Sequence, residues 1–396
     1  MQADHLNLRH LRAFTAVCQN GSVTAASDVV HLSQPAITQA VAGLEVSFGV
    51  ALFTRSHRGM FPTKAGDVLQ SRCERALGLL HDATTSRRKG AQAHAYADSL
   101  TSTQLRALIG VASHGNYSVA ARALGVSQPS LHRAARELEA LAGQALFLKS
   151  PSGITLSPSA TALVRAARLA FAELRQAGDE ITALEGAGIG ELRLGSLPLS
   201  RGTLLPLALN RLTELHPGAQ ITVNDSPYSE MLHALRNGEI DLMLGALRDP
   251  PPAPDVTQEP VFTDKLGIYC RPDHALAGHV PDRATLARFP WVVARKGTPT
   301  RDHFDRYFKG TGTGPIIEAN AMVLVRGLLV GSDKLAMISN TQAADDLASG
   351  ALVRLPVDPG DAPRPIGLTT RSDWQPTPLQ RTFREVLIKV AQSRTL

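Results

Sequence analysis

The sequence is poor in cysteine and contains no long apolar run. Its 396 residues include three cysteines, Cys18, Cys73 and Cys270, which lie far apart and form no Cys-x-x-Cys or Cys/His spacing. This scarcity favours a reducing compartment and no structural metal. No apolar run approaches the length of a membrane span, and the N-terminus lacks the apolar core of a signal peptide. We therefore expect a cytoplasmic protein that does not engage a membrane.

Motifs for catalysis are also lacking. Histidines and carboxylates are plentiful, but none lies in a nucleophile elbow, a metal-ligand pattern or a phosphate-binding loop. The glycine-rich stretch 310–314 does not follow a strand and precede a capped helix, so a dinucleotide site is not expected there. The sequence predicts neither an enzyme nor a need for a cofactor.

Positive charge is present and unevenly distributed. The net charge is +6, and residues 1–90 hold most of the excess, with ten Lys and Arg against six Asp and Glu. A basic segment permits a polyanionic partner without requiring one. An apolar content of 43% over 396 residues is ordinary for a globular chain of two to four domains.

One stretch occurs twice. Ser33-Gln34-Pro35 begins a segment that recurs at Ser127-Gln128-Pro129, 94 positions later. Other residues repeat at the same offset, which indicates an internal duplication. These matching pairs are Leu11 and Leu105, Gly21 and Gly115, Leu44 and Leu138, Leu52 and Leu146, and Gly59 and Gly153.

Each copy predicts a winged helix-turn-helix. Three helices are expected in the first copy: residues 8–20, a second helix capped by Ser22 or Thr24 that ends at Val30, and a third helix capped by Ser33. Residues 52–62 are expected to form a two-stranded wing. The third helix buries one apolar face and leaves a polar face that suits base edges and phosphates. The candidate DNA-binding residues are Ser33, Gln34, Pro35, Thr38, Gln39, Arg55 and Arg58 in the first copy, and Ser127, Gln128, Ser130, His132, Arg133, Arg136 and Lys149 in the second.

A long helix with a heptad pattern follows each wing. The first is capped by Thr63 and extends to about Arg88. A connector at 90–99 then leads into the second module, whose long helix starts at Ser157-Pro158. The predicted seams are Leu69, Cys73, Ala76, Leu80 and Ala83, and then Leu163, Ala167, Ala170, Leu174, Ala177, Ile181 and Leu184. One hypothesis pairs these helices within one chain, as a pseudo-dimer that reads an asymmetric site. The competing arrangement pairs like modules across two chains.

Beyond the glycine-rich hinge at 186–190, short apolar strands alternate with helices. Strands are expected near 191–196, 219–224, 240–245, 260–270, 290–294, 315–318, 335–338 and 366–369, and helices near 203–215, 228–237, 301–309, 321–331, 341–349 and 376–392. This alternation implies parallel sheets in two α/β lobes with a cleft. Polar residues just beyond strand ends suit an anion such as a carboxylate. The candidates are Ser196, Ser200, Arg201, Ser226 and Ser229 in the first lobe, and Arg295, Thr298, Asn320 and Ser339 in the second.

Taken together, the chain resembles the LysR-type transcriptional regulators. The carrying motifs are Gly-Ser-Val-Thr-Ala-Ala (21–26), Ser-Gln-Pro-Ala (33–36), Leu-Phe-x-Arg (52–55), Pro-Thr-x-Ala-Gly (62–66), Leu-Leu-Pro (204–206), His-Pro (216–217) and Leu-x-x-Gly-Glu-Ile-Asp-Leu (235–242). The resemblance implies a homo-oligomer, a dimer or tetramer, that binds double-stranded promoter DNA and responds to a small-molecule effector. It departs from the family in its second DNA-binding module, because ordinary members carry one.

The expected architecture is mixed α and α/β. Residues 1–89 and 98–185 would each form a winged helix-turn-helix with a linker helix. Residues 190–396 would form a two-lobed, periplasmic-binding-protein-like effector domain, with lobes at about 190–262 plus 367–396 and at about 263–366. An alternative is a cytoplasmic small-molecule-binding protein whose second helix-turn-helix serves only dimerisation. A gel shift on the upstream promoter region distinguishes the two, because only a regulator shifts it in a salt-sensitive way.

Overall fold

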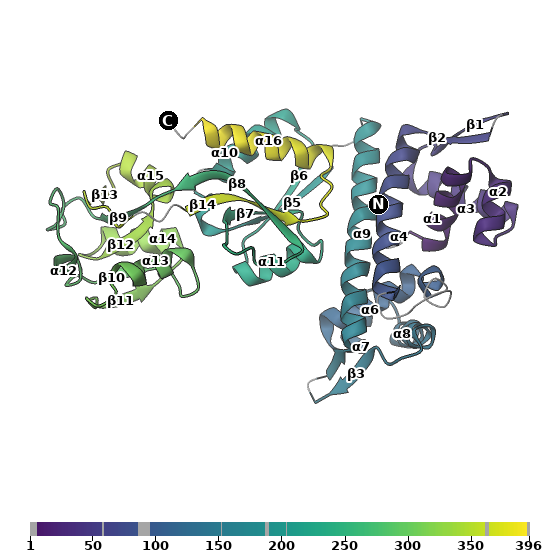
Figure 1. Ribbon diagram of the computed structural model, residues 1–396, viewed down its shortest axis with the longest axis horizontal. Coiled ribbons are helices and arrows are strands. Elements are labelled where there is room, and N and C mark those ends of the chain that lie inside the picture. Colours follow the sequence, from purple (N-terminus) through teal and green to yellow (C-terminus); the bar gives the residue numbers. More distant parts are fainter. Residues whose placement is uncertain are drawn as a thin grey trace. The chain divides into compact units, whose positions relative to one another are not determined.

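The computed structural model describes residues 6–57, 59–85, 96–151, 153–186, 190–202, 204–360 and 364–393. The chain divides into two compact units (Figure 1). The first comprises Met1–Glu191 with the short segments Gly218–Gln220 and Asn237–Glu239, and the second comprises the rest. Within the described part of the chain, no helix is both long enough and apolar enough to cross a bilayer.

The first winged module has the predicted order of elements. These are α1 (Leu8–Asn20), α2 (Val23–Val30), α3 (Gln34–Phe48), the antiparallel strands β1 (Phe53–Ser56) and β2 (Gly59–Pro62), and α4 (Lys64–Thr85). Gly21 ends α1 in the left-handed conformation, as predicted. Of the two possible caps for α2, the cap is Ser22, whose Oγ accepts from the amide of Ala25 at 3.1 Å. The end of α4 predicted near Arg88 lies outside the described residues.

The second module repeats this order. It contains α6 (Ser102–His114), α7 (Tyr117–Ala123), α8 (Gln128–Ala142), the hairpin β3 (Phe147–Ser150) and β4 (Gly153–Leu156), and α9 (Pro158–Leu184). Ser127 caps α8 and Ser157 caps α9, each with a proline in the first turn, as predicted. The duplication in the sequence is therefore a duplication of structure.

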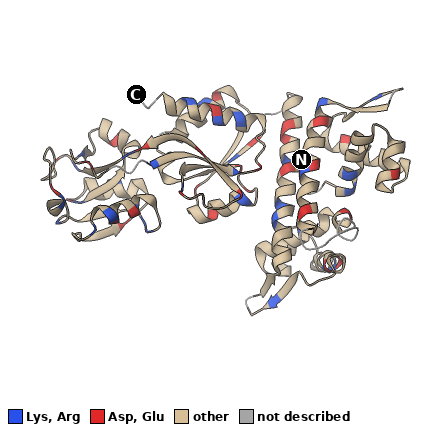
Figure 2. Ribbon diagram, viewed as in Figure 1, with Lys and Arg blue, Asp and Glu red and all other residues tan. Residues whose placement is uncertain are grey.

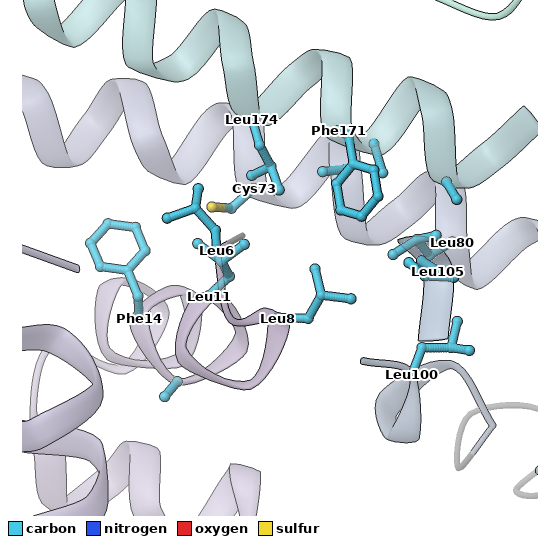
Figure 3. Packing of buried hydrophobic residues seen from close by; sticks show 14 of the residues in the cluster. Leu6, Leu8, Leu11, Phe14, Cys73, Leu80, Leu100, Leu105, Phe171 and Leu174 are labelled. Atoms are coloured by element: carbon cyan, nitrogen blue, oxygen red, sulfur yellow. The ribbon is translucent and has the colours of Figure 1, made fainter. Parts of the chain in front are cut away.

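The two long helices pack against each other and bury the predicted seams. Leu69, Cys73, Ala76 and Leu80 of α4 are buried, as are the seam residues of α9 from Leu163 to Ile181. Figure 3 shows Cys73 of α4 beside Leu174 of α9, above the leucines of α1. Leu184 is 49% exposed, so its predicted place in the seam is wrong. It is the last residue of α9, and the contact ends one turn earlier.

The second unit contains two five-stranded sheets. The first has the order β6-β5-β7-β14-β8 and is formed by β5 (Glu191–Ser196), β6 (Gln220–Asn224), β7 (Leu242–Ala246), β8 (Val256–Asp264) and β14 (Arg364–Arg371). Helices α10 (Leu204–Leu215), α11 (Tyr228–Arg236) and α16 (Pro378–Gln392) pack with this lobe, after a short turn η2 (Pro198–Ser200). Buried Met231, Leu235 and Met243 join α11 to the sheet.

The second sheet has the order β11-β10-β12-β9-β13. Its strands are β9 (Leu266–Cys270), β10 (Trp291–Val293), β11 (Ile316–Glu318), β12 (Leu335–Ser339) and β13 (Val353–Arg354). The helices of this lobe are α12 (Arg283–Leu286), α13 (Pro299–Tyr307), α14 (Met322–Val330) and α15 (Asn340–Ala348). Trp291 is fully buried among Phe304, Phe308 and Leu335, and anchors one side of the sheet.

Two features differ from the predicted lobes. The strand expected at 260–270 is two strands, β8 and β9, which lie in different sheets with only Lys265 between them. A continuous apolar run hides this crossing, because both halves are strand. The sheets are also mixed, since β14 runs antiparallel to β7 and β8, and β9 runs antiparallel to β12. The expectation of parallel sheets is wrong because the chain leaves the first lobe at the end of β8 and returns to it as β14. The returning strand runs in the opposite direction to β8.

Candidate nucleic-acid interface and effector site

The first recognition helix, α3, exposes the predicted polar face. Ser33 caps the helix, with Oγ accepting from the amide of Ala36 at 3.4 Å, and Pro35 occupies the first turn. Thr38 and Gln39 are exposed, while Ile37 is buried on the opposite face. Ser33, Gln34 and Pro35 are exposed at the same end of the helix. The first turns of α3 therefore present hydroxyl and amide groups to solvent.

The second recognition helix, α8, carries more charge and more internal contacts. Arg133 and Arg136 are exposed. Ser127 Oγ accepts from the amide of Ser130 at 3.2 Å, and Gln128 Oε1 accepts from the Ser118 hydroxyl at 2.9 Å. His132 is half-buried, with its ring 4.6 Å from that of Tyr117. The ring contact fixes the imidazole of His132 against α7, whereas both arginines extend from the helix.

Each wing carries an exposed cation among the described residues. Arg55 is exposed on β1, and Lys149 is exposed on β3. Arg58, the other predicted wing residue, lies outside the described residues. A two-stranded wing beside an exposed helix can place such cations near phosphates.

Each wing is held by contacts that its sequence motifs do not reveal. Glu45 Oε1 accepts from the amides of Leu52 and Phe53 at 2.9 and 3.4 Å, and Glu139 Oε1 accepts from Leu146 and Phe147 at 2.8 and 3.1 Å. A glycine in each wing, Gly59 or Gly153, also lies against the first helix–turn of its module. Each glutamate follows a leucine of the repeat, Leu44 or Leu138, which was the available signal, but its hydrogen-bond partners lie seven and eight residues away.

In the first lobe, the predicted effector residues surround the carboxyl ends of β5 and β6. Ser196 and Ser200 are fully buried, and their hydroxyl oxygens lie 3.0 Å apart. Arg201 Nε donates to the carbonyl of Ser196 at 3.0 Å, and its Nη2 donates to the carbonyl of Asp225 at 2.9 Å. Burial lowers the pKa of Arg201 from its ordinary value. These three side chains bind the lobe's own backbone.

Two serines of this lobe are more accessible. Ser226 is half-buried, and its amide donates to Asn224 Oδ1 at 2.9 Å. Ser229 is exposed in the first turn of α11. They follow the end of β6, so the first lobe offers its accessible hydroxyl groups there.

In the second lobe, three of the four predicted residues are linked by hydrogen bonds. The amide of Arg295 donates to Asn320 Oδ1 at 3.0 Å, and the Thr298 hydroxyl donates to the carbonyl of Arg295 at 2.7 Å. Arg295 itself is exposed. Ser339 is separate: it is fully buried and donates to Asp264 Oδ1 at 2.7 Å. The parallel strands β10, β11 and β12 end at one edge of the sheet, which brings these residues to the same side.

Gln342 and Arg248 also make contacts between the lobes, and neither contact followed from the sequence. Gln342 Nε2 on α15 donates to the carbonyl of Pro198 in η2 at 3.3 Å. Arg248 lies 4.5 Å over the ring of Tyr228 in the first lobe, and its Nη2 donates to the carbonyl of Gly297 in the second at 3.4 Å. Both residues lie outside recognisable motifs. They mark where the two lobes meet beside the predicted effector residues.

Two winged helix-turn-helix modules and a two-lobed α/β domain define a DNA-binding regulator with a ligand-sensing domain. The comparisons identify its family. The family model "Bacterial regulatory helix-turn-helix protein, lysR family" matches twice, at residues 8–67 and 102–161, and "LysR substrate binding domain" matches at 185–392. The chain belongs to the LysR family of transcriptional regulators.

Curated relatives differ in how much of the chain they match. The HTH-type transcriptional regulator GalR of Pseudomonas putida KT2440 is 34% identical over 393 residues, which cover 97% of this chain and 98% of GalR. PcaQ of Agrobacterium fabrum C58 is 28% identical over 301 residues, covering 74% of this chain and 96% of PcaQ. The match to GalR thus spans both winged modules. The match to PcaQ includes nearly all of PcaQ but only about three quarters of this chain.

Solved structures confirm the fold. ArgP from Mycobacterium tuberculosis matches with a TM-score of 0.55 and 19% identity, over 73% of this chain and 96% of ArgP. A full-length OxyR variant from Pseudomonas aeruginosa matches with a TM-score of 0.54 and 22% identity, over 73% of this chain and 94% of OxyR. CbnR complexed with its target DNA has a TM-score of 0.51 and 21% identity, over 72% of this chain and 98% of CbnR.

Proposed function

We propose that this chain binds promoter DNA through both winged modules, and that a small anionic metabolite bound by the second unit modulates this binding. The observation that carries the proposal is the pair of recognition helices, α3 and α8, each with an exposed polar face and a wing with an exposed cation. The solved DNA complex of CbnR, a LysR family regulator, supports a DNA-binding role for this fold.

The two modules would divide base and phosphate contacts differently. In the first, Thr38 and Gln39 face the bases, while Arg55 and Arg58 of the wing neutralise phosphates. Ser33, Gln34 and Pro35 bring the positive end of the helix dipole to the DNA backbone. In the second module, Arg133 and Arg136 would approach the groove from the helix itself, and a guanidinium pairs well with guanine.

The remaining residues of the second module would hold and steer its helix. Ser127, Gln128 and Ser130 would contact the phosphate backbone, and Lys149 would add a wing contact. His132 would orient the helix through its ring contact with Tyr117 rather than read a base. Because the two recognition faces differ, the preferred operator is two unlike half-sites rather than a palindrome.

A gel-shift series on the chain's own upstream region tests this proposal. Wild type, Arg133→Ala, and a Thr38→Ala, Gln39→Ala double variant are compared on the full site and on sites with one half scrambled. We expect each variant to lose sensitivity to scrambling of one half only. Arg211→Ala, on the exposed face of α10, is a matched arginine control and leaves the shift unchanged. If the protein gives no salt-sensitive shift at all, it is not a DNA-binding regulator, and the small-molecule-binding alternative holds.

The effector is proposed to be an anion such as a carboxylate. Exposed Arg295 and the accessible Ser226 and Ser229 offer donors beyond strand ends. Asn320 and Thr298 hold the Arg295 backbone in place, while Ser196, Ser200, Arg201 and Ser339 shape the surrounding loops. LysG from Corynebacterium glutamicum, which has the same fold, was solved with arginine as its bound effector, so this fold accepts an amino acid.

Thermal-shift screening tests the effector proposal. Carboxylic acids are compared with their neutral amides on the full-length protein, since a ligand of the native state raises the melting temperature. We expect shifts from the acids that Arg295→Ala abolishes and Arg211→Ala preserves. Equal shifts from acids and amides would contradict an anionic effector.

Association of chains is proposed to involve the second unit. Helix α14 exposes Val323 (87%), Leu324 (52%) and Val330 (49%), and strand β11, which precedes it in the chain, exposes Ile316 and Ile317. Several large apolar side chains exposed in one region mark a protein contact when they form a patch. Light scattering on Val323→Glu tests it: the variant should have a lower mass than wild type, and an unchanged mass would contradict the assignment.

A further inference from the structure

A buried group of charged side chains lies between the two linker helices. Arg72 of α4 donates through Nη1 to Glu173 Oε2 at 2.6 Å and to Gln176 Oε1 at 2.8 Å, and through Nε to Glu180 Oε1 at 3.0 Å. Arg75 adds a bond to Glu173 Oε1 at 2.9 Å. The side chains of Arg72 and Glu173 are only 5% and 7% exposed. We call Arg72, Arg75, Glu173, Gln176 and Glu180 the linker cluster.

The cluster is one-sided. Its two guanidinium groups come from α4, and its two carboxylates come from α9. The contacts run antiparallel, because Arg72 reaches Glu180 and Arg75 reaches Glu173. Figure 2 shows acidic and basic residues along both helices, so the net charge of each helix does not reveal this division.

The duplication reveals what like-with-like pairing would do to these charges. At the offset of 94, Arg72 corresponds to Ala166 and Arg75 to Leu169, while Glu173 corresponds to Leu79. In an α9·α9 pair of the same geometry, both glutamates would therefore face apolar residues. A buried carboxylate without a cation is strongly destabilising.

An α4·α4 pair would suffer in the opposite sense. A second α4 would place Leu79 at the position that Glu173 has in α9, so Arg72 and Arg75 would face an apolar side chain. It would place Asp82 at the position of Gln176, as the acidic residue near the two arginines. Two guanidinium groups would then compete for one carboxylate. Each like-with-like pairing leaves buried charge uncompensated, and α4·α9 compensates it.

We propose that the linker cluster makes α4 and α9 selective partners, so that each chain forms its own pair of unlike DNA-binding modules. Proximity favours this pairing within a free chain, because a short connector gives a millimolar-range effective concentration. In an oligomer, the linker helices of a neighbouring chain also lie close by, so proximity alone does not select the partner. In the oligomer it is the linker cluster that excludes α4·α4 and α9·α9 pairs.

This pairing has a consequence for stoichiometry. One chain supplies two DNA-binding modules and one effector domain, with its linker helices already paired. Oligomerisation then proceeds through other surfaces, and every protomer adds an unlike pair of modules in a fixed order. This pairing of α4 with α9 does not depend on which class of effector the second unit binds.

Cysteine cross-linking of the full-length protein tests partner choice directly. Cys73 lies beside Leu174 (Figure 3), and Leu174 corresponds to Leu80 at the offset of 94. In a Cys18→Ala, Cys270→Ala background, Leu174→Cys should give a disulfide within one chain when treated with copper phenanthroline. Leu80→Cys would give a disulfide between chains only in an α4·α4 pair. We expect no covalent dimer from Leu80→Cys. A covalent dimer would show that α4 pairs with α4 of another chain and would overturn the proposal.

An apolar replacement separates selectivity from stability. Arg72→Leu, Glu173→Leu and Glu180→Leu together should fold with little loss of melting temperature, because apolar residues often replace a buried ion group without cost. In this background, Leu80→Cys should now give covalent dimers in the oligomer. If the cross-linking pattern is unchanged, the cluster does not select the partner.

A charge exchange separates pairing within a chain from pairing between chains. Arg72→Glu with Arg75→Glu, or Glu173→Arg with Glu180→Arg, should each lower the melting temperature by about 10 °C. All four changes in one chain should restore most of the loss, whereas a co-expressed mixture of the two half-variants should not. Recovery in the mixture would mean that α4 and α9 pair between chains. Ser71→Glu, exposed on α4, is the control for added charge.

Discussion

In both winged modules, a glutamate on the third helix holds the wing by two backbone hydrogen bonds, whereas the exposed faces of those helices differ. Glu45 and Glu139 have equivalent partners, and Ser33 and Ser127 cap equivalent helices. Yet α3 exposes Thr38 and Gln39, while in α8 the equivalent His132 is half-buried and Arg133 is exposed. The contacts that build the fold have been kept in both copies, and the side chains that would meet a ligand have diverged.

The linker helices show the same division in a different form. Their apolar seams match, but the cations lie on α4 and the carboxylates on α9. Divergence here falls inside the contact, because the two helices face each other. The copies therefore became different where they meet each other and where they would meet DNA.

The strongest test of the shared construction replaces the wing glycines. Gly59 and Gly153 have φ of 130° and 126°, and an added Cβ would lie 2.6 Å from the carbonyl oxygen of Gly21 or Gly115. The same oxygens accept from the amides of Met60 and Ile154. We expect Gly59→Ala and Gly153→Ala each to cost about 3 kcal/mol of unfolding free energy in urea titrations. Gly78→Ala, in open space on α4, should be neutral or stabilising. A large effect in one module only would show that the copies are not built alike.

The difference between the recognition faces predicts the next largest effects. Arg133→Ala should weaken operator binding by about 2 kcal/mol, since a guanidinium that reads a base is worth about 1–3 kcal/mol. Thr38→Ala should cost about half as much in the other half-site, because a hydroxyl makes a single neutral contact. Binding titrations at fixed salt measure both. Equal losses spread over both half-sites would contradict the assignment of one unlike module to each.

The linker cluster predicts acid sensitivity of the first unit. Burial alone would raise the pKa of Glu173, but hydrogen bonds from Arg75 and Arg72, with their charges, lower it below its ordinary value. The group is thus ionised more readily in the folded state than in the unfolded state. Its stabilising contribution is present above the ordinary carboxyl pKa and is lost as the pH falls through the lower, folded pKa.

Unfolding followed as a function of pH measures this contribution. Wild type should lose stability as the pH is lowered from about 5 towards 3. Glu173→Gln should be less stable at neutral pH and should show a flatter dependence over the same range. Arg75 donates to the same carboxylate, and Glu180 and Gln176 share Arg72 with it, so Arg75→Gln should flatten the dependence in the same direction. An identical pH dependence for wild type and Glu173→Gln would exclude this carboxylate as the source.

How far the sequence predicts this molecule depends on how local each feature is. Helix caps such as Ser33 and Ser157 follow from neighbouring residues, and the structure confirms them. The heptad period predicted which face of α4 is buried, but not that Arg72 lies in it, because period does not identify a partner 101 residues away. The crossing at Lys265 was missed for a related reason: strand propensity does not report which sheet a strand joins. The interlobe contact of Gln342 with Pro198 likewise depends on folded geometry alone.

The smallest expected effects concern the wings, where each module places an exposed cation on its first strand. Arg55 and Lys149 are exposed cations on equivalent strands, and phosphate contacts carry little sequence information. Arg55→Ala and Lys149→Ala should each reduce the slope of log affinity against log salt by about 1, equally on the natural site and on scrambled DNA. Binding titrations from about 50 to about 200 mM salt resolve a change of that size in the slope. If Arg55→Ala instead relaxes discrimination at one base pair, the first module reads bases with its wing, which would set it apart from the second in mechanism as well as in composition.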